Sequence, residues 1–179
     1  MNAYDLAYAE LLTSAQLHED QLAELLGSML SADIDGAEFY FQNTIHEGWS
    51  LEDGLVKDAS FSIDRGVGVR ALSGEKTGFA YSDEITLPAL KQAAQAARSI
   101  ARAGQSQTVA LTQKKSPHGL YLPIDPIGSL DEAGKIDLLR RLDAFTRAQD
   151  SRVVEVQASL NAVADTILVA HSDGTFAAD

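Results

Sequence analysis

The chain has 179 residues, of which 45% are hydrophobic and 22% charged, and these values predict one soluble globular domain. A formal net charge of −12, without clustered Lys and Arg, argues against binding to nucleic acid. The apolar runs are too short to cross a bilayer, and the N-terminus lacks the basic segment of a secretory signal. We therefore expect a cytoplasmic protein without nucleic-acid or membrane partners. Because the chain has no cysteine, disulfides, thiolate metal sites and cysteine nucleophiles are excluded.

The first thirty residues show the spacing of two helices. One apolar stripe contains Tyr4, Tyr8, Leu11 and Leu12, and it is interrupted near Thr13. A second stripe repeats every three or four residues, at Leu22, Leu25, Leu26, Met29 and Leu30. Polar residues and Gly36 then end the helical pattern.

From Ala37 the apolar period changes to two, which predicts strands. Phe39 and Phe41 belong to a first strand, and 45–51 is a second strand candidate. Asp53-Gly54 predicts a tight hairpin turn, because a type I′ turn needs two residues with positive φ. The expected continuation is a returning arm at 55–64, alternation at 67–71, a turn at Ser73-Gly74 and a short strand at 77–81. Residues 37–81 are thus predicted to form an antiparallel meander with one buried face.

The second half begins with a predicted helix at 87–103, with Pro88 in its first turn and Gly104 after its end. We expect residues 105–115 to form a mobile loop, followed by an irregular segment that contains three prolines. Ser129 and Glu132 have the spacing of a capping box, which predicts a helix from there to Gln149. Its predicted core face contains Ile136, Leu139, Leu142 and Phe145.

The C-terminal segment returns to strands, predicted at 154–160 and 166–170, with a hairpin turn at Asp173-Gly174. The strand that starts at Thr175 has few residues before Asp179, so we expect the chain to be a piece of a longer polypeptide. Together the elements predict an α/β fold of the α+β type. In this two-layer domain, helices pack on a largely antiparallel meander sheet.

Four histidines are candidate metal ligands: His18, His46, His118 and His171. His18 and His46 each precede a glutamate, but neither is followed by a second histidine one helical turn later, as a metallopeptidase helix requires. A zinc site assembled from distant histidines stays open as an alternative to four ordinary histidines. A second alternative is a self-sufficient hydrolase that uses His46 or His171 with nearby acids.

Other motifs give no complete catalytic pattern. Gly66-Val67-Gly68 starts like a dinucleotide-binding loop, but the sequence continues as a strand. Adjacent carboxylates occur at Glu52-Asp53, Asp83-Glu84 and Asp131-Glu132, for which turns and helix starts are the simpler explanation. No nucleophile elbow is present. We therefore predict no catalytic, cofactor-binding or metal-binding residue in this chain.

Three stretches nevertheless resemble one family closely. They are AEFYFQNTIHEGWSLEDGLVKDASFSIDRGVGVRALSGEKTGFAYSDEI, KIDLLRRLDAFTRAQD and ILVAHSDGTFAAD. They resemble the TldD/PmbA family of zinc metallopeptidases, whose names include modulator of DNA gyrase. The resemblance implies that residues 1–179 are the N-terminal domain of a TldD-like protein. It also implies that zinc is bound by an HExxxH motif in a C-terminal domain that is absent here.

The resemblance also carries functional expectations. The parent protein is expected to be a dimeric protease that degrades or trims unfolded peptides, either with a TldE/PmbA-like partner subunit or as a homodimer. This domain, inactive alone, is expected to contribute to the cleft wall, peptide binding and dimer assembly. Extended peptide is expected to add to a sheet edge within 37–81. The alternative is a stand-alone interaction or oligomerisation module without a peptidase role.

Overall fold

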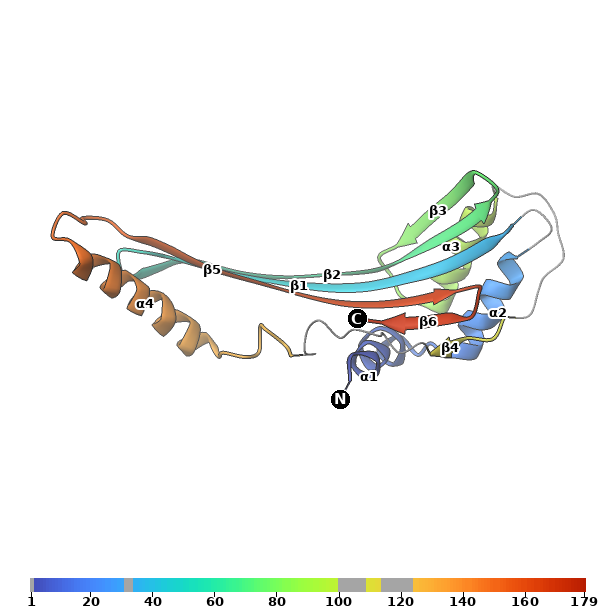
Figure 1. Ribbon diagram of the computed structural model, residues 1–179, viewed down its shortest axis with the longest axis horizontal. Coiled ribbons are helices and arrows are strands. Elements are labelled where there is room, and N and C mark those ends of the chain that lie inside the picture. Colours follow the sequence, from blue (N-terminus) through green and yellow to red (C-terminus); the bar gives the residue numbers. More distant parts are fainter. Residues whose placement is uncertain (1, 31–33, 100–108, 114–123) are drawn as a thin grey trace. The chain divides into compact units, whose positions relative to one another are not determined.

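The computed structural model describes residues 2–30, 34–99, 109–113 and 124–179 (Figure 1). The chain divides into two compact units, which are described separately. Unit 1 contains Met1–Asn43, Asp64–Pro123 and Thr166–Asp179, and unit 2 contains Thr44–Ile63 and Ile124–Asp165. Within the described ranges, no helix is both long and apolar enough to cross a membrane.

The strands form one sheet in the order β3-β2-β1-β5-β6-β4. β2 pairs with β3 and β5 with β6 in antiparallel fashion, whereas the two-residue β4 pairs with β6 in parallel. The predicted α+β fold with a largely antiparallel sheet is confirmed. The strand bounds are β1 Gly36–Glu52, β2 Leu55–Ser73, β3 Lys76–Ser82, β4 Thr112–Gln113, β5 Gln157–His171 and β6 Thr175–Ala178.

Three strands are longer than the sequence predicts. β1 is one continuous strand rather than two, β2 runs through the expected gap between 64 and 67, and β5 is continuous through the expected break between 160 and 166. The apolar alternation is interrupted by buried polar residues. Asn43 and Thr166 both donate hydrogen bonds to Glu10, the latter at 2.8 Å, and Thr44 donates to Asp165. Because these side chains have partners, the strands continue through them.

The three predicted hairpin turns are confirmed. Asp53 and Gly54 have φ values of 50° and 75°, as a type I′ turn requires. Gly74 and Gly174 also have positive φ, at 55° and 91°. The β1–β2, β2–β3 and β5–β6 connections therefore lie where the turn residues predict them.

In the part of the chain that the structure describes, unit 1 contains the N-terminal helices and one later helix. The predicted break near Thr13 is present, because a 3₁₀ turn ends at Gln16, which has a φ of 55°. The prediction of a loop at 105–115 is wrong at β4, where hydrogen bonding to the β5–β6 hairpin makes a strand. The predicted helix end at 100–103, Gly104 and His118 lie outside the described residues. The helices are α1 Ala3–Ala7, η1 Tyr8–Leu12, η2 Thr13–Ala15, α2 Glu19–Met29 and α3 Leu87–Arg98.

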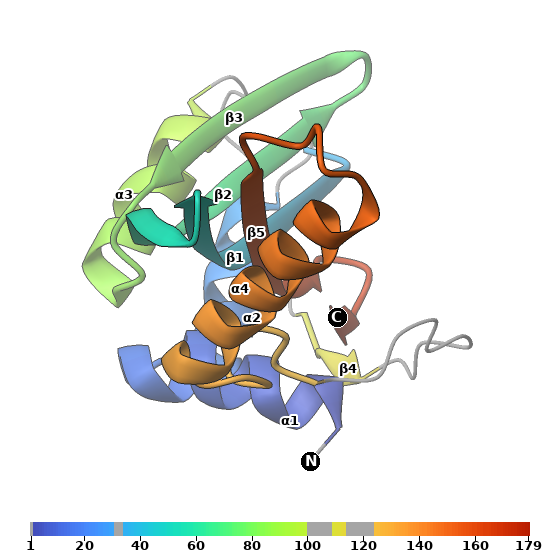
Figure 2. The ribbon, with the colours of Figure 1, turned by 90° about the vertical axis from the view of Figure 1, so that its left-hand side faces the viewer.

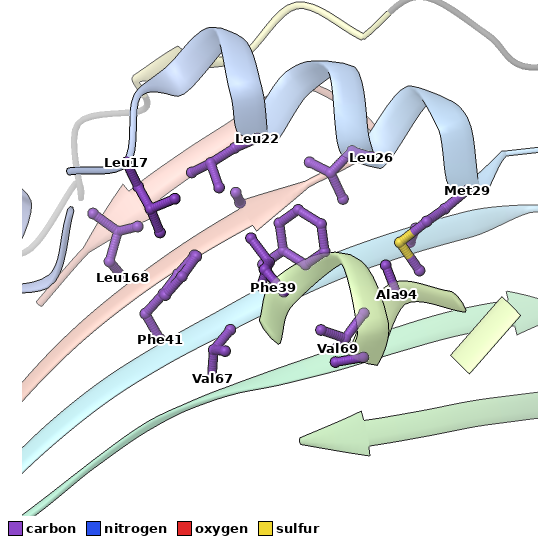
Figure 3. Close-up of a cluster of buried hydrophobic side chains, with 14 of the residues drawn as sticks. Leu17, Leu22, Leu26, Met29, Phe39, Phe41, Val67, Val69, Ala94 and Leu168 are labelled. Atoms are coloured by element: carbon purple, nitrogen blue, oxygen red, sulfur yellow. The ribbon is translucent and has the colours of Figure 1, made fainter. Parts of the chain in front are cut away.

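Helices α2 and α3 cover one face of the unit 1 strands and enclose an apolar core (Figure 3). Phe39 and Phe41 of β1 are fully buried and meet edge to face, with ring centroids 6.3 Å apart. Alternate residues of a strand point to the same face, so the two phenylalanines enter the same core. Their apolar neighbours include Leu22, Leu26, Met29, Val67, Val69, Leu90, Ala94, Leu168 and Phe176.

Unit 2 has a single helix, α4 Glu132–Gln149, along its strands (Figures 1 and 2). The predicted cap is wrong: Asp131 is the N-cap and accepts from the Gly134 amide at 2.8 Å, whereas the Ser129 hydroxyl donates to the Pro126 carbonyl. The predicted core face is wrong at two of its four positions. Leu139 is buried and Ile136 is partly buried, but Leu142 and Phe145 are 46% and 65% exposed. The buried residues of α4 are Lys135, Leu139 and Asp143. Lys135 and Asp143 can be buried because each has a charged partner, Glu47 and Arg147 respectively.

Candidate functional site

The three described histidines occupy separate places in the fold. His18 is the N-cap of α2, His46 lies exposed on β1, and His171 ends β5. His171 Nδ1 accepts a hydrogen bond from the Asp173 amide at 3.1 Å. The described part of the chain contains no group of three or more His, Asp or Glu residues that could hold a metal ion.

Asp173, the acid nearest to His171, stabilises the β5–β6 turn. Its Oδ1 accepts from the Thr175 amide at 2.7 Å and lies 3.1 Å from His171 Nδ1. Hydrogen bonds from Thr175 are the main reason why the pKa of Asp173 lies well below its ordinary value. An ionised aspartate that accepts local amide bonds is typical of a turn. The geometry therefore gives this pair a role in the hairpin.

The glycines of 66–68 allow close backbone packing in β2. A Cβ at Gly66 would lie 2.7 Å from the Ser82 carbonyl oxygen, and one at Gly68 would lie 3.2 Å from the Phe79 ring. The segment remains a strand and opens no helix. The sequence interpretation of these residues as sheet glycines is confirmed.

A buried ion pair connects α4 to β1 in unit 2. Lys135 Nζ lies 2.6 Å from Glu47 Oε2, and the two side chains are only 8% and 11% exposed. Trp49 Nε1 donates to Glu47 Oε1 at 2.9 Å, so each carboxylate oxygen has a donor. The hydrogen bond from Lys135 is the main reason why the pKa of Glu47 is lowered, against an opposing effect of desolvation. With a donor on each Glu47 oxygen, this ion pair holds α4 against β1.

The Lys135–Glu47 pair is not predicted from the sequence, although one signal for it is present. Lys135, Leu139 and Asp143 have the i, i+4, i+8 spacing of one helix face. A stripe that mixes a cation, an apolar residue and an acid indicates a face that packs through paired charges. The acid on the strand cannot be identified from that spacing, because the pairing partner is distant in sequence.

A second charged network holds the β1–β2 turn. Arg147 of α4 contacts Asp53, Asp143 and the carbonyl of Val154. Asp53 also accepts from the Val156 amide at 3.2 Å, and this bond is the largest cause of its lowered pKa. The adjacent carboxylates Glu52-Asp53 therefore lie at a hairpin whose tip is fixed to α4.

The other two carboxylate pairs also lie at element ends. Asp131-Glu132 starts α4, where Asp131 is the cap. Asp83-Glu84 follows β3, and the Glu84 amide donates to the Ser82 hydroxyl at 3.1 Å. Turns and helix starts explain both positions.

The outer part of β2 offers a binding surface of a different kind. We call Leu55–Ile63 the β2 edge; all of its residues are exposed. β3 pairs with β2 only over Val67–Ser73, so the β2 edge has no strand on its outer side in the described ranges. Phe61 and Ile63 are 61% and 55% exposed. Unpaired backbone groups beside exposed apolar side chains suit the addition of an extended peptide.

Two further surfaces are less specific. Leu142 and Phe145 form an exposed apolar patch on α4, called the α4 patch below. In unit 1, a groove of about 340 Å³ lies between α2 and α3 and is lined by both apolar and charged side chains. Its residues are Gln21, Glu24, Leu25, Ser28, Leu87, Lys91, Ala94, Gln95 and Arg98.

Comparison with known proteins gives two successive family matches. The model for PmbA/TldA metallopeptidase domain 1 matches residues 37–101, and the model for the PmbA/TldA metallopeptidase central domain matches residues 125–179. A metalloprotease TldD homologue from Haemophilus influenzae is 45% identical over 171 residues. This match covers 94% of the chain but 36% of the homologue. The chain thus spans about a third of the length of the curated relatives that it matches.

Solved structures share the fold. A Bacteroides thetaiotaomicron protein described as a modulator of DNA gyrase has a TM-score of 0.62 and 15% identity, covering 89% of this chain and 37% of that one. TldE from Thermococcus kodakarensis has a TM-score of 0.57 and 17% identity, covering 88% and 35%. At these identities the likeness shows the fold alone. On the sequence matches, the chain belongs to the PmbA/TldD family of metallopeptidases and corresponds to a TldD-type segment that carries the first and central family domains.

Proposed function

We propose that residues 1–179 form the non-catalytic N-terminal part of a TldD-like zinc metalloprotease. The parent protein degrades or trims unfolded peptides, and its zinc is bound in a C-terminal domain. This segment contributes a wall of the substrate cleft and binds peptide along the β2 edge. The family match supports the assignment to a metalloprotease. One observation supports peptide binding, namely that the outer side of the β2 edge is exposed.

The β2 edge suits an unfolded substrate for a physical reason. A peptide that adds as a strand gains main-chain hydrogen bonds that do not depend on its sequence. The exposed side chains of Phe61 and Ile63 add apolar contacts along the same strand. Together these features favour extended, unfolded chains over folded proteins, whose backbone groups are already paired.

Proline substitutions test which edge binds. The residues that flank a two-residue turn form a hydrogen-bonded pair, so Ser73 directs its N–H toward β3 and Leu55 directs its N–H toward β1. Because both residues are odd-numbered, the direction changes once along β2. A Cβ at Gly48 would lie 2.8 Å from Ser60 Oγ, which places the change between Leu55 and Ser60, so Ile63 directs its N–H outward.

Ile63→Pro therefore removes an outward N–H from the β2 edge, and Ile63→Ala controls for the lost side chain. Ser159→Pro on β5 is the matched control. A fluorescein-labelled unstructured decapeptide is titrated into each variant and followed by fluorescence anisotropy.

We expect Ile63→Pro to weaken peptide binding about tenfold relative to Ile63→Ala, corresponding to one or two lost strand hydrogen bonds. Ser159→Pro should leave binding unchanged. Equal binding by Ile63→Pro and Ile63→Ala, with both folded by circular dichroism, contradicts peptide addition at the β2 edge.

A second candidate function, assembly of subunits, is favoured by the α4 patch. Phe145 is 65% exposed although it occupies a helix face that the sequence predicts to be buried. We propose that this patch contributes to a dimer with a TldE/PmbA-like partner or a second copy. Sedimentation velocity of the chain, alone and mixed with such a partner, tests this. Phe145→Glu should abolish any dimer, and an unchanged dimer in that variant contradicts the role of the patch.

A further inference from the structure

The hydrogen-bond ladder between β5 and β6 continues to the last residue. Leu168, Val169 and Ala170 lie opposite Ala178, Ala177 and Phe176. One step further, the Ile167 amide donates to the Asp179 carbonyl at 2.9 Å, and the Asp179 amide donates to the Ile167 carbonyl at 3.1 Å. These two bonds make Ile167 and Asp179 a complete hydrogen-bonded pair of an antiparallel ladder.

β5 extends well beyond this pair, back to Gln157. We call Gln157–Ala164 the β5 edge. The sheet order places β1 on one side of β5 and β6 on the other, and β6 accompanies β5 only near its C-terminal end. In the described ranges, no strand follows the β5 edge on the β6 side.

The direction of β6 determines what comes next along this edge. In an antiparallel pair, each step forward on one strand is a step back on the other. Because Ile167 lies opposite Asp179, the fourth residue after Asp179 would lie opposite Val163, and the sixth opposite Asn161. A strand that keeps this register therefore runs directly along the β5 edge.

The composition of the β5 edge indicates that it is normally paired. Exposed edges are usually protected by lysine, other charges or proline. The β5 edge contains none of these between Gln157 and Ala164, whereas the β2 edge contains Lys57 and Asp58. Val163 is 52% exposed, and the even-numbered residues from Ala158 to Ala164 are partly buried. Such a strand lacks the features that prevent another strand from pairing with its edge.

We propose that, in the longer polypeptide, the residues that follow Asp179 extend β6 along the β5 edge and add a strand to the sheet of unit 2. The matched relatives are nearly three times as long as this chain, so they have polypeptide available for this role. A segment tethered directly to Asp179 needs no loop closure to reach the edge. It therefore occupies the edge in preference to a second copy or a free peptide, which must bind from solution.

Residue-specific amide hydrogen exchange tests this proposal. Ile167 directs its N–H toward β6, so Val163, Asn161 and Ser159, at intervals of two residues, direct theirs toward the same side. The even-numbered residues Ala158, Leu160 and Ala162 face β1 and serve as internal controls. The comparison uses this chain and a version extended by the next dozen or so residues of the Haemophilus influenzae homologue.

We expect exchange at the amides of Ser159, Asn161 and Val163 to slow at least tenfold in the extended chain. The even-numbered amides should change little, which also verifies that the extended chain is folded. Proline at the fourth added residue, whose N–H would face β5, should remove the protection. Proline at the fifth added residue, whose N–H would face away, should leave most of it.

Two results overturn the proposal. One is unchanged exchange at the three odd-numbered amides in a folded extended chain. The other is concentration-dependent protection in the unextended chain, which assigns the edge to a second copy. If the extended chain does not fold, the same comparison is made between the full-length Haemophilus influenzae homologue and its matched 171-residue segment.

Discussion

The two units of this chain have interiors of different chemistry. In unit 1, aromatic and aliphatic side chains from the strands and helices form one apolar cluster that includes Phe39, Phe41 and Phe176. In unit 2, the buried apolar residues are few, and α4 is held by the Lys135–Glu47 ion pair and by Arg147 with its two aspartates. Dispersion and burial of apolar surface stabilise the first unit, whereas directional polar contacts position the second.

This difference matters for the proposed function. A dry, close-packed core makes unit 1 a stable support. Unit 2 keeps exposed apolar residues on the β2 edge and on α4, where partners can reach them. The long strands β1, β2 and β5 contribute residues to both units. If the two interiors differ in this way, substitutions in each unit should affect stability through different interactions.

The largest effect is expected in the core of unit 1. Phe39→Ala removes a fully buried ring and leaves a cavity, so the free energy of unfolding should fall by about 4 kcal/mol. Urea denaturation followed by far-ultraviolet circular dichroism measures it. Phe79→Ala, at a position 66% exposed, is the control and should cost less than about 1 kcal/mol. Equal losses in the two variants would show that the core assignment is wrong.

The next experiment breaks the ion pair of unit 2. Lys135→Met leaves the Glu47 carboxylate buried without its cation and should destabilise unit 2 by about 3 kcal/mol. The fluorescence of Trp49, the only tryptophan, reports on this site because its indole contacts Glu47. Adding Glu47→Gln removes the unpaired charge and should recover most of the loss. A double variant as unstable as the single one argues against the pair as the cause.

The same pair predicts the response of unit 2 to acid. The pKa of Glu47 is lowered in the folded state, so the unfolded chain binds more protons at low pH. The stabilisation is therefore present above about pH 4.5 and is lost as the pH falls through the lower, folded-state pKa. Acid titration of Trp49 fluorescence should show this loss, and Lys135→Met should reduce it. An identical acid transition in that variant would rule out the pair as its source.

The smallest effect concerns the start of α4. Asp131→Ala removes the N-cap hydrogen bond to the Gly134 amide and should cost about 1 kcal/mol. Ser129→Ala, at the position that the sequence favoured as the cap, should cost no more than about 0.5 kcal/mol. Urea denaturation monitored by Trp49 fluorescence compares the two. A larger loss in Ser129→Ala would restore the sequence-based assignment.

Local chemistry made much of the fold predictable from sequence. Asp53-Gly54 and Asp173-Gly174 identify turns because few residues accept positive φ. The spacing of Leu22, Leu26 and Met29 identifies a helix face that is indeed buried. In both cases the determining interactions lie within a few residues of each other.

The errors arose where distant partners decide the outcome. Asn43 and Thr166 resemble strand breaks until Glu10 is known to pair with both. Phe145 resembles a core residue because apolar periodicity does not reveal that Lys135 and Asp143 occupy the buried face of α4. The β2 edge lay within the predicted meander, but its exposure depends on where β3 stops pairing. Such facts are set by tertiary contacts, which one sequence does not show.

The proposed role of this segment is to support peptide binding, while the metal chemistry belongs to another domain of the parent protein. The zinc content of the purified chain, determined by mass spectrometry, and peptide turnover in the same sample test this division of roles. We expect no stoichiometric zinc and no turnover above a protein-free blank. A tightly held zinc ion, with peptide cleavage that is lost on chelation, would contradict it.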